Sequence, residues 1–280
     1  MTLAEHLLGL RPAAPSAGRL RARVDGRLVV VTGASRGVGA ETAARLALAG
    51  ARVVLLARGN EALDTVARGI RRRGGSAEVL PVDLSDPDAA AAAGTQILDR
   101  WGTPAVVVSN AGMSLRRTLL DSRDRPQDVA RTIAVNYTGP VALLRRLVPA
   151  MVAAGTGHVV SVASTSVDIP APGWSLYGAS KTAMDAWLRA VALELEPSGI
   201  AVTSIRLPLV HTAMSAPTAA YAAVPAMRPI DAAKYVARAI VDRPLVLAPW
   251  WSRLANIALA VNPRLLDPAL RGWDRMIDRA

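Results

Sequence analysis

One segment near the N-terminus limits the fold of this chain more than any other, because it joins a strand, a glycine-rich turn and a helix without a gap. Leu28 to Val31 are all apolar and indicate a buried strand. The turn 32–39, with the sequence TGASRGVG, follows at once, and a helical pattern continues to Ala49 before Gly50 ends it. The unpaired N–H groups at such a helix start attract phosphate. This order predicts a βαβ unit with a pyrophosphate site where its first strand ends.

The same alternation of strand and helix continues along the chain. Strands are predicted at 51–57, 77–82, 105–108, 158–162 and 200–207, and helices at 61–73, 87–101, 126–154 and 175–196. We therefore expect an α/β protein with a single doubly wound Rossmann-type domain, in which helices cover both faces of a parallel sheet. We assign an N-terminal arm to 1–24, the Rossmann-type domain to 25–248 and a C-terminal amphipathic helical extension to 249–280.

Composition narrows the class of protein. The 280 residues are 51% hydrophobic, which is enough for a large core. There are no cysteines, the first twelve residues lack the features of a secretory signal, and no apolar run is long enough to cross a bilayer, so we expect a cytoplasmic protein. The net charge is +11, but the arginines are scattered and no nucleic-acid-binding motif occurs, so no nucleic-acid partner is expected. No cluster of histidines or carboxylates has metal-ligand spacing, so no metal is expected.

A second stretch, residues 157–181, carries the residues that we expect to perform chemistry. Its predicted strand ends in small hydroxylated residues that include Ser164, and a helix begins near Tyr177 after a loop rich in Pro and Gly. Tyr177 and Lys181 are four residues apart, so both side chains lie on one helix face. The ammonium favours the phenolate, so Tyr177 should exchange a proton nearer neutral pH than its free pKa of about 10 allows. Only Lys181 and Lys234 among the 33 basic residues are lysines, which favours a role for Lys181 over a chance pairing.

The TGxxxGxG turn, Ser164 and the Tyr177–Lys181 pair together resemble the short-chain dehydrogenase/reductase family, over about residues 25–245. The resemblance implies an oxidoreductase that acts on carbonyl and CH–OH groups. Its catalytic residues would be Asn136, Ser164, Tyr177 and Lys181. Asn136 would hold a water that links Lys181 to bulk solvent, and a buried structural amide is the alternative for this residue.

The resemblance also implies a set of cofactor-binding residues at the carboxyl ends of the strands. These are Gly33, Ser35, Arg36, Gly37, Val38, Gly39, Arg58, Asp83, Leu84, Asn110, Ala111, Gly112, Tyr177, Lys181, Val210 and Thr212. Two positions depart from the family pattern: Ser109 stands where Asn is usual, and Leu209 stands where Gly is usual. His211 lies in a loop with no carboxylate nearby in sequence and is expected to be a bystander.

The second strand indicates which nicotinamide cofactor is used. A carboxylate near its end would bind the ribose hydroxyls of the adenosine and repel a 2′-phosphate. This chain has Ala57 and then Arg58 at that point, and Arg36 lies in the glycine turn. Two guanidinium groups and no acid predict NADP(H).

The C-terminal part should select the substrate. Residues 212–228 are rich in Ala, Pro and Met, as expected of a mobile lid over an apolar substrate, and the pattern PLVxTxMxAPT resembles short-chain reductases related to bacterial fatty acyl-CoA reductases. Trp250 and Trp251 open an amphipathic segment. That segment could close the substrate pocket, pack on a subunit or lie on a membrane as a peripheral contact.

These observations lead to one principal hypothesis and two rivals. The principal hypothesis is NADP(H)-dependent reduction of an apolar carbonyl compound (a fatty acyl thioester, a fatty aldehyde or a lipophilic ketone), or the reverse oxidation of an alcohol, by a homo-oligomer. The rivals are a non-catalytic NADP(H)-binding sensor and a membrane-peripheral scaffold on the same fold. The intact set of Ser, Tyr, Lys and Asn argues against a sensor.

Overall fold

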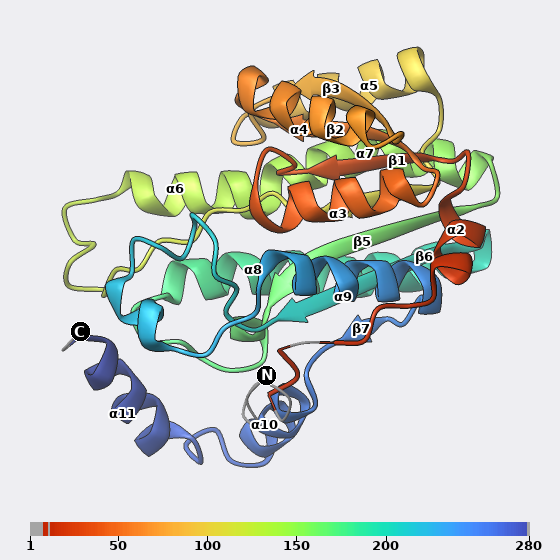
Figure 1. The fold of residues 1–280 in the computed structure, drawn as a ribbon. Coiled ribbons are helices and arrows are strands. Elements are labelled where there is room, and N and C mark those ends of the chain that lie inside the picture. Colours follow the sequence, from red (N-terminus) through yellow and green to blue (C-terminus); the bar gives the residue numbers. More distant parts are fainter. Residues whose placement is uncertain (1–7, 11, 279–280) are drawn as a thin grey trace.

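The computed structural model describes residues 8–10 and 12–278 and shows a parallel sheet with helices on both faces (Figure 1). All strand pairs are parallel, in the order β3-β2-β1-β4-β5-β6-β7. The fold class predicted from the sequence is therefore confirmed. The strands are β1 Leu28–Thr32, β2 Arg52–Ala57, β3 Ser76–Pro81, β4 Val106–Ser109, β5 Gly157–Ser164, β6 Ile200–Leu207 and β7 Val246–Leu247.

Helices bury the two faces of the sheet in two separate hydrophobic clusters. Alternate residues of each strand point to opposite faces, so Val29 and Val31 of β1 join one cluster while Val30 joins the other. Helices α2 (Ala17–Val24), α3 (Gly37–Leu48), α4 (Asn60–Arg72) and α9 (Pro229–Asp242) cover the first face. Helices α5 (Pro87–Trp101), α7 (Gly139–Ala153) and α8 (Ser175–Leu195) cover the second face. Burial on both faces explains why the central strands read as continuous apolar runs.

The topology places a crevice at the carboxyl ends of the central strands. The chain builds β1, β2 and β3 in one direction and then returns to add β4 on the other side of β1. Ligands of doubly wound sheets bind outside the strand ends at such a reversal point. The glycine turn after β1 and the loop after β4 both open there.

The predicted N-terminal arm contains regular structure that the sequence did not indicate. Residues 17–24 form α2, which starts with Ser16 accepting a hydrogen bond from the N–H of Arg19. Leu20 and Val24 are buried in the sheet's first cluster, against α9. The rest of the arm that the structure describes also contacts the domain, since the carbonyl of Gly9 accepts a 3.2 Å hydrogen bond from the Tyr235 hydroxyl. Residues 1–7 and 11 of the arm lie outside the described residues.

The prediction of one long helix over 126–154 is wrong. The structure has α6 (Gln127–Ile133), a π-helical turn η1 (Ala134–Thr138) and then α7. Pro140 has no N–H and cannot donate to the carbonyl four residues earlier, that of Asn136, so the regular α-helical pattern breaks there. Such π-turns frequently mark functional sites, and this one carries Asn136.

The chain after β6 forms α9 and the edge strand β7 before it leaves the sheet. Short 3₁₀ turns η2 (Thr165–Val167), η3 (Glu196–Ser198) and η4 (Ala219–Ala223) lie in the connections. Helices α10 (Trp250–Val261) and α11 (Asp267–Asp278) follow β7 and lie apart from the two helical layers (Figure 1). The predicted helical extension is thus two helices, and residues 279–280 lie outside the described part. None of the described helices has the length and apolarity to span a bilayer.

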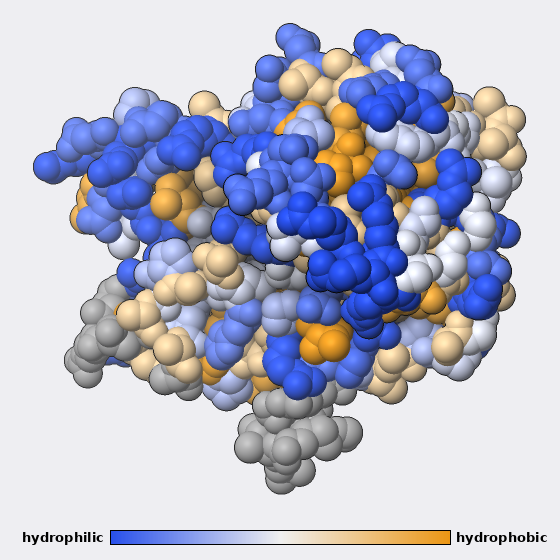
Figure 2. Space-filling model, turned by 45° about the horizontal axis from the view of Figure 1, so that its top comes forward, coloured by the Kyte–Doolittle hydropathy of each residue, from blue (hydrophilic) through white to orange (hydrophobic). Residues whose placement is uncertain are grey.

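Figure 2 shows one face of the molecule coloured by hydropathy. Hydrophobic residues form small separate areas between hydrophilic ones on this face.

Candidate active site

The glycine turn after β1 is shaped for close approach to a phosphate. Gly33 has a φ of 64°, and a methyl group on Gly39 would overlap the carbonyl oxygen of Gly33. No side chain caps the N-terminus of α3, so its first N–H groups point into the crevice without a side-chain partner among the described residues. These features fit the pyrophosphate of a dinucleotide. The same turn includes Ser35, Arg36, Gly37 and Val38, so the structure brings these predicted residues together.

Residues after β4 hold the turn in place. The Thr32 hydroxyl accepts hydrogen bonds from the backbone N–H groups of Asn110 and Ala111, both at 2.9 Å. The Asn110 amide in turn donates to the carbonyl oxygens of Thr32 at 3.0 Å and Gly33 at 3.3 Å. Asn110 and Ala111 thus support the cofactor turn from the neighbouring strand. Ser109, which departs from the family pattern, is a buried strand residue beneath them.

The structure brings Ser164, Tyr177 and Lys181 together as the sequence predicted. Ser164 ends β5, and its side chain is hydrogen-bonded to the Tyr177 hydroxyl. The Lys181 ammonium donates to the carbonyl oxygen of Val162 at 3.1 Å and lies 6.0 Å from the centroid of the Tyr177 ring. A methyl group on Gly112 would lie 3.1 Å from the ammonium, a tight contact that glycine avoids.

Burial controls the protonation of both titrating groups. It raises the pKa of the Tyr177 phenol, and the hydrogen bond with Ser164 acts in the opposite direction. Burial lowers the pKa of Lys181 from 10.5 to about 8. The prediction that Lys181 lowers the pKa of Tyr177 is wrong for this structure, because the ammonium is directed at a backbone carbonyl and desolvation of the phenol dominates.

Asn136 links the loop after β4 to α8. Its amide nitrogen donates to the carbonyl of Met113 at 2.9 Å and to the Ser180 hydroxyl at 2.8 Å, and its amide oxygen accepts from the Met113 N–H at 2.7 Å. Ser180 donates to the carbonyl of Tyr177 at 2.7 Å. Asn136 is therefore a buried bracing residue in this structure. The water link to Lys181 stays a prediction.

The adenosine side of the crevice contains Arg58, Asp83 and Leu84. Burial would raise the pKa of the Asp83 carboxyl, but hydrogen bonds from Ser85 and the nearby charge of Arg58 lower it below its usual value. Arg58 and Asp83 thus lie close enough to interact. Arg36 lies at the N-terminal end of α3, on the neighbouring element.

The loop after β6 returns to the glycine turn. The Thr212 methyl group is 3.3 Å from the position that a methyl group on Gly37 would occupy, and Val210 forms a bridge with Met227. Both predicted cofactor residues of this loop therefore lie at the crevice. His211 contacts the carbonyl oxygen of Tyr221 at 3.0 Å through its ring and touches none of the catalytic residues by hydrogen bond, which fits a bystander.

An aromatic cover over Tyr177 was missed by the sequence analysis. The rings of Trp174 and Tyr221 stack with centroids 5.3 Å apart, and the charge of the Tyr177 phenolate raises the pKa of Tyr221 in addition to the effect of burial. Ile277 of α11 is buried against this pair. The turn η4 and helix α11 thus meet over the Tyr177 phenol. No local sequence signal could reveal this, since Trp174, Tyr221 and Ile277 lie on three distant segments.

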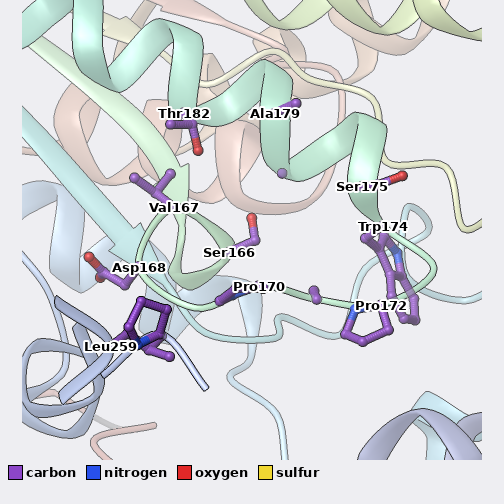
Figure 3. A pocket seen from close by; sticks show the side chains of 13 residues that line it. Ser166, Val167, Asp168, Pro170, Pro172, Trp174, Ser175, Ala179, Thr182 and Leu259 are labelled. Carbon is purple, nitrogen blue, oxygen red and sulfur yellow. The ribbon is translucent and has the colours of Figure 1, made fainter. Parts of the chain in front are cut away.

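An apolar groove with a volume of about 550 Å³ adjoins this cover. The loop 166–174 and the first turns of α8 form its wall, and Leu259 lies across from the loop residues Asp168 and Pro170 (Figure 3). Trp174 lines the groove and also packs with Tyr177, so the groove adjoins the residue that carries the phenol. The sequence predicts that residues 212–228 and the segment after Trp250 line an apolar pocket. Only Leu259 and Pro263 of that segment line this groove.

The described residues, 8–10 and 12–278, contain no group of three or more His, Cys, Asp or Glu side chains that could hold a metal ion. The polar groups around Tyr177 and the glycine turn include a hydroxyl, a phenol, an ammonium and backbone amides. These are the groups needed for proton transfer at a carbonyl oxygen and for binding of phosphate.

Comparison with known proteins agrees with this arrangement. Residues 27–222, well over half of the chain, match the short chain dehydrogenase family. The chain belongs to the short-chain dehydrogenase/reductase family. It is accordingly an oxidoreductase acting on carbonyl and CH–OH groups with a nicotinamide cofactor.

Among short-chain family members, the similar curated proteins include fatty acyl-CoA reductases. One from Acinetobacter baylyi is 40% identical over 243 residues, covering 87% of this chain and 82% of that protein. One from Mycobacterium tuberculosis is 38% identical over 249 residues, covering 89% of this chain and 85% of that protein. The predicted resemblance of the C-terminal part to this subgroup is thereby confirmed.

Two solved structures of the family contain NADP. A metagenomic short-chain oxidoreductase in complex with NADP has a TM-score of 0.70 and 35% identity, covering 81% of this chain and 96% of that one. A 3-oxoacyl (acyl-carrier-protein) reductase from Agrobacterium tumefaciens with NADP bound has a TM-score of 0.72 and 26% identity, covering 80% and 94%.

Proposed function

We propose that this protein is an NADP(H)-dependent reductase of apolar carbonyl compounds: a fatty acyl thioester, a fatty aldehyde or a lipophilic ketone. The reverse oxidation of the corresponding alcohol uses the same groups. The observation that carries the proposal is a protonated phenol that is hydrogen-bonded to Ser164 and lies on a residue packed against Trp174. Trp174 also lines the adjoining apolar groove. The fatty acyl-CoA reductases among the relatives support the same substrate class.

The chain's own residues account for the proton side of the reaction. Because burial raises its pKa, the Tyr177 phenol is protonated at neutral pH and can donate its proton to the carbonyl oxygen. The Ser164 hydroxyl lies beside it and can hydrogen-bond the same oxygen while negative charge develops there. The Lys181 ammonium lies 6.0 Å from the centroid of the Tyr177 ring, and its role in the proposal is to hold the ribose of the bound nicotinamide. When bound, the nicotinamide supplies the hydride that reaches the carbonyl carbon.

The preference for NADP(H) rests on the charge around the second strand. Arg58 lies close to Asp83 at the adenosine side, and the end of β2 offers Ala57 where a ribose-binding acid would stand. A guanidinium binds a phosphate through paired hydrogen bonds. The NADP found in two solved relatives supports this choice.

Substitution of Tyr177 by Phe tests the reaction type. The variant should lose nearly all NADPH-dependent turnover of a carbonyl compound, while NADPH affinity stays within a few fold. Turnover is followed by NADPH absorbance, and affinity by quenching of protein fluorescence. Wild-type turnover in the variant would refute the mechanism, and NADPH binding without turnover by any carbonyl compound in the wild type would favour the rival sensor.

A homologous series of aldehydes and ketones tests the substrate class. Each buried CH₂ contributes about 0.8 kcal/mol, so a few added methylenes should raise kcat/KM by an order of magnitude until the groove is filled. Leu259→Ala should reduce this gain because Leu259 lines the groove, whereas Leu254→Ala on the exposed side of α10 should not. A flat chain-length profile in the wild type would contradict an apolar-chain substrate.

Three further parts of the proposal concern the setting of the enzyme. We propose a homo-oligomer, as expected from the family resemblance, and a cytoplasmic location, as expected from the sequence. We also propose that α10 contacts a membrane surface, because it leaves Trp250, Leu254, Ile257 and Val261 largely exposed on one side. The last part has its own test below.

A further inference from the structure

A buried arginine on β6 lies at the centre of the catalytic half of the molecule. Arg206 is one of the few charged residues in the interior, with its side chain only 8% exposed. Its backbone is in register with Ala163 of β5, the residue immediately before Ser164. The guanidinium bonds through Nη1 to Asp168 and through Nη2 to Asp185, the latter at 3.0 Å. None of these three charged residues was singled out in the sequence.

The two carboxylates belong to the two segments that carry the catalytic groups. Asp168 follows Ser164 by four residues, across the single turn η2. Asp185 follows Lys181 by four residues and Tyr177 by eight, so it continues the same face of α8. One guanidinium therefore fastens the serine loop and the Tyr–Lys face of α8 to the same strand.

The C-terminal extension completes this network. The Ser252 hydroxyl, fully buried on α10, donates to the second oxygen of Asp168 at 2.5 Å. The Ser204 hydroxyl donates to the second oxygen of Asp185, also at 2.5 Å. Ser252 lies beyond residues 27–222 that match the family, so this bond ties the C-terminal extension to the matched part of the chain.

The charges of the network are poorly explained by stability alone. Two carboxylates and one guanidinium are removed from water, and such buried ion pairs often stabilise a fold no better than apolar side chains of the same size would. What they do provide is geometry: the fork of arginine binds two carboxylates at set angles, and each carboxylate is held by a second donor. A displacement of about 1 Å of a catalytic group can cost about 10²-fold in rate.

We propose that Arg206 is a positioning residue that holds Ser164 against Tyr177, and that α10 contributes to this alignment through Ser252. The inference rests on the proposed function, since it assigns Ser164 and Tyr177 to the reaction. It predicts that loosening the network weakens the Ser164–Tyr177 hydrogen bond. Because that bond lowers the pKa of the phenol, its loss should move the ionisation of Tyr177 to higher pH.

The test uses the full-length protein and the mild change Ser252→Ala, with Asn256→Ala on the exposed side of α10 as the matched control. We expect Ser252→Ala to lower kcat by about tenfold, with KM for NADPH within twofold of wild type. Ionisation of Tyr177 is read from the pH titration of tyrosinate absorbance, as the difference between each protein and its Tyr177→Phe derivative. The pKa of Tyr177 should shift upward in Ser252→Ala and stay unchanged in Asn256→Ala.

Arg206→Lys is the second variant, because an ammonium keeps the charge but cannot bridge two carboxylates as the guanidinium fork does. It should lower kcat by about 10²-fold. If it does not fold, Ser252→Ala decides alone. Unchanged kcat and unchanged Tyr177 ionisation in Ser252→Ala would overturn the inference, even if the melting temperature fell. The titration needs no substrate, so absence of turnover in the wild type would refute the proposed function and leave this readout intact.

Discussion

At the scale of single residues, burial determines the chemistry of the site more than pairing does. The same desolvation raises the pKa of Tyr177 and lowers that of Lys181 to about 8, because each group loses the water that would stabilise its charged form. In the proposed reaction, Tyr177 therefore acts as an acid. Reduction then requires the protonated phenol, so kcat measured from pH 6.5 upward should decline as Tyr177 ionises.

Arg58 should decide the choice of cofactor. A charge-assisted hydrogen bond to a 2′-phosphate is worth about 1.5–3 kcal/mol, so Arg58→Ala should weaken NADPH binding by roughly tenfold or more and hardly affect NADH. Arg36→Ala should have the same selectivity. Titration of both cofactors by fluorescence measures the effect, and Arg68→Ala on the exposed surface of α4 is the control. Equal losses for NADPH and NADH would show that Arg58 does not bind the phosphate.

His158 should make the protein sensitive to acid. It is fully buried at the start of β5, with Nε2 2.8 Å from the Thr203 hydroxyl, and burial together with Arg243 and Arg23 lowers its pKa from 6.5 to about 3. Between these values the unfolded chain binds a proton that the folded protein excludes. The contribution of His158 to the free energy of unfolding is therefore fully present above pH 6.5 and is lost as the pH drops toward 3.

The effect should reach about 2.7 kcal/mol two pH units below the unfolded pKa. His158→Gln keeps a hydrogen-bonding side chain and removes the titration. Urea denaturation of this variant should show a flatter decline of the unfolding free energy between pH 6.5 and 4.5 than wild type. Identical slopes in the two proteins would assign acid sensitivity to other groups.

At the scale of elements, the π-turn η1 joins the two binding regions of the crevice. Its Asn136 braces the loop after β4 against α8, while the next residue after the turn, Gly139, packs against the backbone of Leu84 at the adenosine side. One irregular turn thus contacts both the catalytic and the cofactor-binding segments. A regular helix would direct these residues differently.

Gly139→Ala should disturb both segments. A methyl group there would overlap the carbonyl oxygen of Leu84, which is backbone and cannot move aside without displacing the strand end. We expect a loss of about 1–3 kcal/mol in unfolding free energy and weaker NADPH binding. The control is Gly69→Ala in α4, where no atom lies within 4 Å, and which should raise stability by about 0.5–1 kcal/mol. Equal effects of the two substitutions would contradict the close contact.

At the scale of the whole molecule, the C-terminal extension has two different sides. One side faces inward, with Ser252 in the charged network, Leu259 at the groove and Ile277 on the aromatic cover. The other side exposes Trp250, Leu254, Ile257 and Val261, at successive helical spacings of four, three and four residues. α10 contains Arg253 and no acidic residue.

This outer side should bind an anionic lipid surface, since an apolar stripe with cationic flanks is attracted to one by burial and charge. Flotation with phosphatidylserine-containing vesicles should recover the wild-type protein, and more of it at low salt. Leu254→Glu with Ile257→Glu should abolish flotation, whereas Leu119→Glu, on a loop and more exposed than either, should not. If the double variant instead becomes a smaller oligomer and the wild type never floats, α10 is a subunit contact.

The sequence alone determined the features that depend on neighbours within a few residues. The apolar runs of β1 and β5, the glycine turn at 32–39 and the four-residue spacing of Tyr177 and Lys181 each follow from local backbone geometry, so they predicted the fold class and grouped the catalytic residues. The domain boundaries of the arm and the extension stay predictions.

Only the tertiary structure decided the contacts between segments far apart in the chain. Asp168 and Ser252 are 84 residues apart, and no periodic pattern relates Trp174, Tyr221 and Ile277. The structure also shows a raised pKa of Tyr177 where the sequence predicted a lowered one. The helical spacing brings Lys181 near Tyr177, but the direction of the ammonium and the burial of the phenol depend on the residues packed around them. Spacing along a helix is a local property, whereas burial and charge pairing are properties of the whole fold.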